Sequence, residues 1–255
     1  MGRDDDRAQA GDHHPLVTGR GSGISLHSLV KSLADNKQLL GMRYAEWCTA
    51  APTLEADIAA AAMGLDDLGH SRVLYGSLRE LGADDGSGNE SGYTNVPFLD
   101  QPWTDWSQFV AANAVLDGAF TLMIESLASG NVEVLRSRLK KMLQEEHYHA
   151  LHGRSWMGEM NATAAAKEAF SQAIEWFGPE GNDIDRLHDE GQLAFGIREL
   201  RRRLAESLGG PEPEPRVDWT SWDPVRRRTS RGGIDAQTLE MLQGLAEKRY
   251  MPAGG

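Results

Sequence analysis

The stretches Asp66-Asp67-Leu68-Gly69-His70 and Glu145-Glu146-His147-Tyr148-His149 decide how this chain folds. In each stretch an acidic residue stands three positions before a histidine, and the two pairs are Asp67 with His70 and Glu146 with His149. On a helix, positions i and i+3 lie on one face about a turn apart, so both side chains of a pair can bind the same ion. The sequence therefore predicts two helices that each carry a carboxylate–histidine pair.

A polar residue precedes each pair by the same interval. Counting back 29 residues leads from Asp67 to Gln38 and from Glu146 to Asp117. In both halves these residues stand about 14 positions from the turn between the helices, which is roughly 20 Å along a helix. We therefore expect two helical hairpins whose polar residues meet at one height. This is the layout of an all-α, ferritin-like four-helix bundle, in which such side chains surround two metal ions.

The chemistry of these side chains indicates which metal to expect. The predicted metal ligands are Gln38, Asp67, His70, Asp117, Glu146 and His149. Carboxylate oxygens with one imidazole per metal suit iron or manganese better than zinc, so the expected cofactor is a di-iron centre, with manganese as an alternative at one site. The competing interpretation is a metal-free hydrogen-bond network, because buried carboxylates must be paired or neutralised.

Gln38 departs from this pattern, because an amide stands where a carboxylate is expected. It can coordinate through its oxygen, but as a neutral and weaker ligand. Asp35, one turn earlier, is either a substitute ligand or a solvated residue. His152 follows His149 by three positions and is either a group that supports the site or part of the helix surface.

Composition limits the class of protein. The chain has 255 residues, 40% of them hydrophobic, which is enough to bury one sizeable core with extra elements around it. Its formal charge of −12 argues against nucleic-acid binding. Cys48 is the single cysteine, so an internal disulfide is excluded and a reducing cytoplasm is expected. We see no secretory signal at the N-terminus and no uncharged run of membrane-spanning length.

The pattern along the chain predicts three regions. Residues 1–24 are expected to be a disordered tail, 25–209 a helical bundle with accessory helices, and 210–255 an extended arm followed by a C-terminal helix. The expected helices are 25–48, 54–81 with Thr53 as N-cap, 104–128 with Thr104 as N-cap, 132–160, 164–177, 184–208 and 235–248. Arg198, Arg201 and Arg202, and the run Arg226–Arg228, are interpreted as solvated faces, with phosphates or an acidic protein partner as the alternative.

Two parts of the chain resemble a known family. The segment from Ala51-Pro52-Thr53-Leu54 through the first pair to Leu81-Gly82 resembles the phenylacetyl-CoA epoxidase subunits of phenylacetate catabolism, as does Leu116-Asp117-Gly118-Ala119 with the second pair. The resemblance covers residues 25 to about 160. It implies one of two related subunits: a catalytic one whose di-iron centre oxidises the aromatic ring of a CoA thioester, or a structural partner that has lost most ligands.

The residues of this sequence match both kinds of subunit. Glu46-Trp47-Cys48 and the short connection that follows resemble the structural subunit, whereas both complete carboxylate–histidine pairs resemble the catalytic one. By this resemblance Gln38 matches a position where the catalytic subunit has glutamate, and Met63 one where it has lysine. Glu46 resembles an acidic residue that helps near the metal, which makes it the expected catalytic residue; a helix-terminal carboxylate is the alternative.

The resemblance implies a function and partners. We expect a di-iron oxygenase-type subunit of a multicomponent monooxygenase acting on an aromatic acyl-CoA. Its partners would be a homologous subunit or a second copy, and a separate reductase, because one cysteine cannot hold an iron–sulfur cluster. The alternative is a non-catalytic structural subunit of the same kind of complex. A metal storage protein is a third interpretation.

Overall fold

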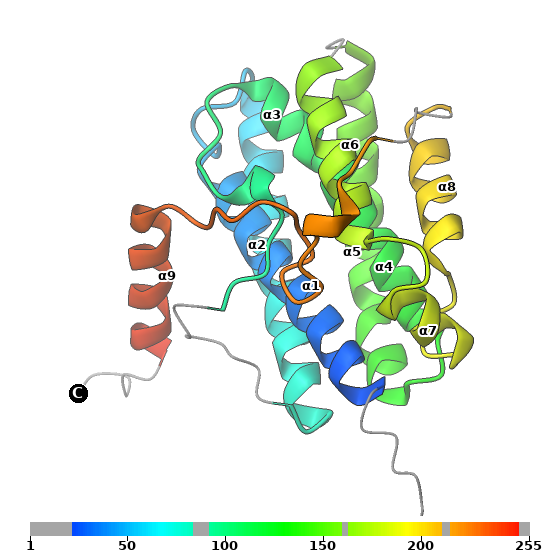
Figure 1. The fold of residues 1–255 in the computed structure, drawn as a ribbon. Helices are drawn as coiled ribbons and strands as arrows, with labels where there is room; N and C mark the ends of the chain where they lie inside the picture. Colours follow the sequence, from blue (N-terminus) through cyan, green and yellow to red (C-terminus); the bar gives the residue numbers. More distant parts are fainter. Residues whose placement is uncertain (1–21, 84–91, 160–162, 211–214, 250–255) are drawn as a thin grey trace, which may run out of the picture.

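The structure, a computed structural model, describes residues 22–83, 92–159, 163–210 and 215–249. Four long helical segments form a bundle: α1 (Ser22–Ala45), α2 (Leu54–Glu80), the continuous segment α3 (Trp106–Ala111), η2 (Ala112–Asp117) and α4 (Gly118–Ser129), and α5 (Glu133–Glu159). Figure 1 shows them side by side, with the later helices around the bundle. Within the described residues there is no β-strand, only the isolated bridge between Asp223 and Arg228. The all-α, ferritin-like prediction is confirmed.

The starts of two bundle helices show how local chemistry sets the boundaries. Thr53 caps α2 as predicted, because its side chain accepts a hydrogen bond from the Ala56 amide. The third segment starts later than predicted. Its cap is Asp105 and not Thr104: the Asp105 carboxylate accepts from the Ser107 and Gln108 amides, and the Gln108 side chain bonds back to the Asp105 amide.

The third segment is the central helix of the core. From Trp106 to Ser129 it is apolar and long enough to span a membrane by length and composition, but 72% of its most apolar window is buried inside the bundle. Burial by neighbouring helices is the ordinary reason for such a composition in a core helix. Its middle turn, Ala112–Asp117, has π-helical hydrogen bonding and ends at Asp117. Such wide turns re-aim side chains and are frequent at functional sites.

The chain after α5 differs from the prediction at one place. After α6 (Thr163–Phe177), the single helix expected at 184–208 is two helices, α7 (Asp183–Asp189) and α8 (Ile197–Ser207). Gly191 breaks the helix with a φ of 74°. Its carbonyl accepts from the Asn131 amide, and the Phe195 amide donates to the Ser126 hydroxyl. The break thus attaches this part of the chain to the end of α4.

The C-terminal arm, residues 215–235, contains η3 (Trp219–Ser221) and leads to α9 (Ala236–Arg249), which lies at the side of the bundle in Figure 1. The expectation that the whole run Arg226–Arg228 is solvated is wrong, because Arg227 and Arg228 are each 1% exposed. Arg227 donates to the Trp176 and Phe177 carbonyls at the end of α6. Arg228 binds both carboxylate oxygens of Asp100. The two guanidinium groups fasten the arm to the bundle.

Some expectations cannot be compared with the structure. The predicted tail, apart from residues 22–24 at the start of α1, and the first part of the predicted loop at 84–91 lie outside the described residues. The rest of that loop packs against the bundle. It includes the short helix η1 (Pro97–Leu99), and its side chains at 94–96 and 98–100 are buried.

Candidate functional site: a buried ion cluster

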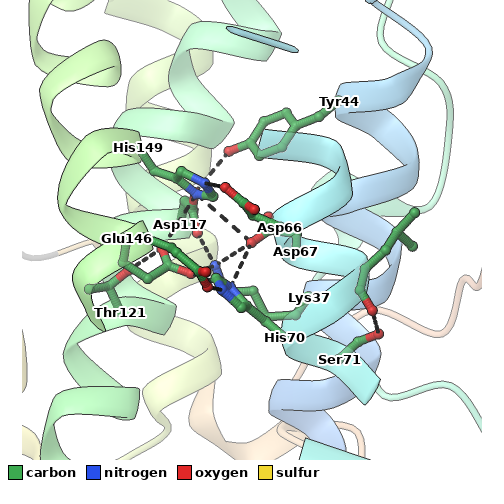
Figure 2. A network of polar contacts seen from close by, with 12 residues as sticks. Lys37, Tyr44, Asp66, Asp67, His70, Ser71, Asp117, Thr121, Glu146 and His149 are labelled. Carbon is green, nitrogen blue, oxygen red and sulfur yellow. Dashed lines mark hydrogen bonds and ion pairs between the residues drawn. The ribbon is translucent and has the colours of Figure 1, made fainter. Parts of the chain in front are cut away.

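Five of the six predicted ligands lie together in the middle of the bundle. Asp67 and His70 come from α2, Asp117 from the end of η2, and Glu146 and His149 from α5. Each is at most 2% exposed. Figure 2 shows their side chains converging between the helices. The matched spacing in the sequence is therefore reproduced as proximity in space.

A lysine occupies the centre of this group. The Lys37 ammonium, on α1, donates to Asp67 Oδ1 at 2.8 Å and makes shorter hydrogen bonds to Asp117 Oδ1 and Glu146 Oε1. The Lys37 side chain is fully buried. An ammonium has three N–H donors, so each donor has its own carboxylate, and the three carboxylates come from three different helical segments. We call Lys37, Asp67, His70, Asp117, Glu146 and His149 the ion cluster.

His70 lies between carboxylates on both sides of its ring. Its Nδ1 atom is 2.9 Å from Glu146 Oε1 and 3.4 Å from Asp67 Oδ1. Its Nε2 atom donates to Glu145 Oε2 at 2.8 Å. Burial alone would lower the pKa of His70, but Asp67 and Glu146 outweigh it and raise the pKa to about 10. The ring is therefore an imidazolium at neutral pH.

His149 mirrors this arrangement on α5. Its Nδ1 atom donates to Asp117 Oδ2 at 3.0 Å, and its Nε2 atom lies 3.5 Å from Asp66 Oδ2. Burial would lower the pKa of His149, but the hydrogen bond to Asp117 and the surrounding carboxylates raise it to about 9. Both histidines thus act as cations that face carboxylates.

Two hydroxyl groups complete the polar contacts at the edge of the cluster. Tyr44 donates to Asp117 Oδ2 at 3.2 Å, and Thr121 donates to Glu146 Oε2 at 2.7 Å. Tyr44 is fully buried, and burial together with the carboxylates raises its pKa well above the usual value. The phenol therefore remains a neutral donor.

The ion cluster sets three carboxyl groups against three basic groups, and burial raises the pKa of Asp117. Three carboxylates face the Lys37 ammonium and two imidazolium rings. Burial would lower the pKa of Lys37, but Asp117, Asp67 and Glu146 raise it well above its usual value. Burial would raise the pKa of Glu146, but Lys37 and the two histidines hold it well below its usual range. A buried set of ions tolerates its loss of hydration only when it is paired in this way.

The sixth predicted ligand, Gln38, is turned away from the cluster. Its Oε1 atom accepts hydrogen bonds from Tyr75 at 3.2 Å and Tyr93 at 3.0 Å. Neighbouring helical residues point about 100° apart, so Lys37 and Gln38 cannot both face the bundle axis. Lys37, the residue before Gln38, points into the cluster where Gln38 was expected.

Glu46, the predicted catalytic residue, lies just beyond the C-terminus of α1. It accepts a hydrogen bond from Arg43 Nη1 at 2.7 Å, and its side chain is 30% exposed. Burial raises the pKa of its carboxyl in spite of the neighbouring guanidinium. Arg43 also binds Asp235 beside the start of α9. Glu46 thus contacts Arg43, the residue that ties the end of α1 to the C-terminal region.

Asp35 and His152 were each left with two interpretations. A solvated Asp35 is wrong: it is 1% exposed and accepts from Tyr75 and from the backbone and side chain of Thr94. His152 is half-buried, and its Nδ1 atom lies 2.9 Å from Asn113 Oδ1. Burial, with the charge of His149, lowers the pKa of His152 to about 4, so its ring stays neutral.

A pair of metal ions does not fit this arrangement of side chains. The point enclosed by the carboxylate oxygens is filled by Lys37 Nζ, and Gln38 is held elsewhere by two tyrosines. Among the described residues, the donor atoms of Asp67, Asp117, Glu146 and His149 lie within 4.8 Å of one another. That is a set of ligands around one point.

A pattern in the sequence indicates that Lys37 is buried, although the spacing of the carboxylate–histidine pairs does not reveal it. The buried face of α1 carries Leu29, Leu33, Leu40 and Tyr44, all fully buried, in steps of four and seven residues. Lys37 stands four residues after Leu33 and seven before Tyr44, so it falls on the same face. A lysine at an apolar position of a core helix requires buried anions, and the acid–histidine pairs supply them.

A pocket of about 310 Å³ adjoins the cluster. It lies beside η2, α4 and α5 and reaches Asp117, Glu146 and His149. Thr121, Arg154 and Ser207 line it as well. The ion cluster is therefore buried but lies against a space that small solutes can enter.

Comparison with known proteins identifies a family for the chain. The family described as "Phenylacetic acid catabolic protein" matches residues 21–206. The chain is similar to two different subunits of the 1,2-phenylacetyl-CoA epoxidase of Escherichia coli (strain K12). It is 30% identical to the first over 229 residues, which are 87% of this chain and 85% of that protein. It is 26% identical to the second over 199 residues, 66% of this chain and 62% of that protein.

Proposed function

Because the chain belongs to the phenylacetic acid catabolic protein family, we propose that it is a non-catalytic partner subunit of a multi-subunit monooxygenase that acts on an aromatic acyl-CoA. The catalytic chemistry would belong to a homologous subunit that holds the metal centre. A separate reductase would deliver electrons to that subunit. We propose that the complex works in the cytoplasm.

One observation carries this proposal: the Lys37 ammonium lies between the three carboxylates that would otherwise face a metal. A non-haem metal centre supplies the electrons and the reactive oxygen species in this class of chemistry, and the protein supplies ligand geometry. A subunit whose carboxylates are bound to its own lysine lacks that centre. What it keeps is a rigid, charge-balanced bundle, which suits a structural role.

A second observation supports contact with a partner. Large apolar side chains are exposed on two neighbouring helices: on α2 Leu54 (69% exposed), Ile58 (62%) and Leu65 (72%), and on α5 Tyr148 (71%) and Leu151 (49%). The three α2 residues are spaced by four and seven positions, so they share one face. Exposed groups of apolar and aromatic side chains mark protein–protein contact surfaces. We call these five residues the apolar face.

The di-iron oxygenase-type subunit remains the second candidate. It is favoured by the convergence of Asp67, His70, Asp117, Glu146 and His149, because a subunit that had only a structural role would not need both carboxylate–histidine pairs. In this candidate Lys37 would have to leave the cluster when iron binds. Aromatic acyl-CoA oxidation would then take place in this chain, with the iron as its cofactor.

Reconstitution separates the two candidates. The chain is purified from iron-supplemented cells, alone and together with its own organism's homologue of the second E. coli epoxidase subunit described above, and supplied with reductase and phenylacetyl-CoA. We expect no stoichiometric iron and no thioester-dependent oxygen consumption in the chain alone, and a stable complex whose oxygen consumption requires both chains. About two irons per chain, with thioester-dependent oxygen consumption by the isolated chain, would support the oxygenase instead.

A further inference from the structure

We propose that Lys37 is a built-in cation that closes a binding site for one divalent metal ion, whose ligands would be Asp67, Asp117, Glu146 and His149. The inference rests on the same lysine as the proposed function, but it concerns the isolated chain and needs no partner. It predicts that replacing Lys37 on α1 lets the bundle bind a divalent metal ion in place of the ammonium.

The first step is the position of the ammonium. Lys37 Nζ bonds one oxygen each of Asp67, Asp117 and Glu146, and all four side chains are at most 1% exposed. These are hard oxygen ligands around one point, with the His149 ring within reach of the same point. Carboxylate oxygens with an imidazole are donors that Mn²⁺, Fe²⁺ and Co²⁺ accept. The lysine and a metal ion would compete for the same oxygens.

The second step is the charge. Removal of the ammonium leaves three buried carboxyl groups without the cation that bonds one oxygen of each, which is costly in a low-dielectric interior. A divalent ion at the same point would face the same three carboxyl groups. The site emptied by the substitution would therefore attract a cation strongly.

The third step is free ligand capacity and access. One atom of the ligand set, Asp67 Oδ2, is buried without a hydrogen-bond partner. Buried polar atoms without partners are uncommon and call for an explanation. The pocket beside Asp117, Glu146 and His149 gives a small ion a route from solvent.

The fourth step limits the site to one ion. A second ion would need a ligand from α1, and Gln38 is held by the Tyr75 and Tyr93 hydroxyls. His70 faces Glu145 and Glu146 and balances charge. The geometry thus supplies ligands for one cation where the family layout has two.

The experiment measures Mn²⁺ and Co²⁺ binding to the purified chain by titration calorimetry and by the visible spectrum of Co²⁺. Lys37→Ala and Lys37→Met remove the ammonium, and Met also fills most of the volume. The matched control is Lys31→Ala, which removes another α1 lysine whose ammonium binds Asp35 and the Gly92 carbonyl. A double variant, Lys37→Met with His149→Ala, tests the ligand set.

We expect wild type and Lys31→Ala to bind no metal at the cluster, and a Lys37 variant to bind one equivalent and to melt at a higher temperature with Mn²⁺ than without. The double variant should bind on the order of 100-fold more weakly than Lys37→Met. Stoichiometric binding by the wild type would overturn the inference. So would two folded Lys37 variants that bind nothing, or a Lys37→Met variant that neither folds alone nor is rescued by Mn²⁺.

Metal binding by the Lys37 variants can be judged separately from whether the chain forms a complex with a partner subunit. A complex that forms without any metal binding by the Lys37 variants would leave the partner role intact and remove the closed site. A Lys37 variant that binds one metal ion, in a chain that forms no complex, would support the closed metal site and contradict the partner role.

Discussion

Gly41 on α1 and Gly64 on α2 face each other at the closest approach of these two helices. A Cβ atom on Gly41 would lie 2.8 Å from the Gly64 carbonyl oxygen and 2.9 Å from the Leu68 amide nitrogen, both backbone atoms that cannot move aside easily. The contact lies one turn after Lys37 and beside Asp67. It therefore sets how far α1 stands from the helix that bears the first carboxylate–histidine pair.

Gly41→Ala should destabilise the chain by about 1–3 kcal/mol, because the extra methyl group overpacks a backbone contact. The matched control is Gly69→Ala on α2, where a Cβ meets nothing within 4 Å. This control should be neutral or stabilising by up to about 1 kcal/mol, since alanine is the better helix former. Urea unfolding followed by circular dichroism measures both, and equal effects would contradict the close contact.

Asp117→Asn should cost about 3–5 kcal/mol of unfolding free energy, because it leaves the buried Lys37 and His149 with one carboxylate fewer. The control is Glu80→Gln, which breaks the exposed pair with Arg138 and should cost about 0–1 kcal/mol. Denaturant titration at pH 7 compares the two. A small effect at Asp117 would mean that its carboxylate is not the partner of the ammonium.

The thermal stability should fall at alkaline pH. The pKa values of His70 and His149 are raised to about 10 and about 9, so the folded chain holds two protons that the unfolded chain loses near pH 6.5. Their contribution is fully present below about pH 6.5, declines as the pH rises, and is gone above the folded pKa values. The melting temperature from pH 6 to 10 should decrease, and His70→Gln should flatten the curve. A melting temperature that rises over this range would contradict the imidazolium assignment.

Arg228→Ala should destabilise the chain by about 3–5 kcal/mol, because Asp100 loses a buried two-point ion pair. Arg231→Ala, an exposed residue of the same arm, is the control and should change stability by less than about 0.5 kcal/mol. Urea unfolding measures both variants, and limited proteolysis of the arm gives a second readout. An arm that stays protected in Arg228→Ala would show that this residue does not hold it.

Ile58→Ser should leave the isolated chain folded with its stability within about 0.5 kcal/mol of wild type, because the side chain is already exposed. Its affinity for the partner subunit should fall about tenfold or more if the apolar face is the contact surface. Val225→Ser, which changes an apolar side chain of similar exposure (61%) on the C-terminal arm, is the control. Surface plasmon resonance with the immobilised partner compares them, and equal affinities would exclude Ile58 from the contact.

The helical bundle itself was predictable from the sequence. Apolar periodicity, the Thr53 cap and the glycine-bounded turns determine the helices locally. The equal spacing of Gln38 and Asp67, and of Asp117 and Glu146, places polar residues at one height in any antiparallel hairpin. The convergence of the two carboxylate–histidine pairs follows from this, because helix geometry fixes the rise for each residue.

The partner of those carboxylates was decided by tertiary structure. Lys37 and Gln38 are adjacent, and a rotation of α1 by one residue exchanges which of them faces the bundle axis. That rotation depends on packing between distant residues, such as Gly41 against Gly64, which no local pattern contains. The burial of Asp35, Arg227 and Arg228 could not be predicted for the same reason, since their partners lie far away along the chain. The sequence by itself determined that the two carboxylate–histidine pairs converge. Only the folded structure decided that Lys37 lies between their carboxylates, because this depends on the rotation of α1 against distant parts of the chain.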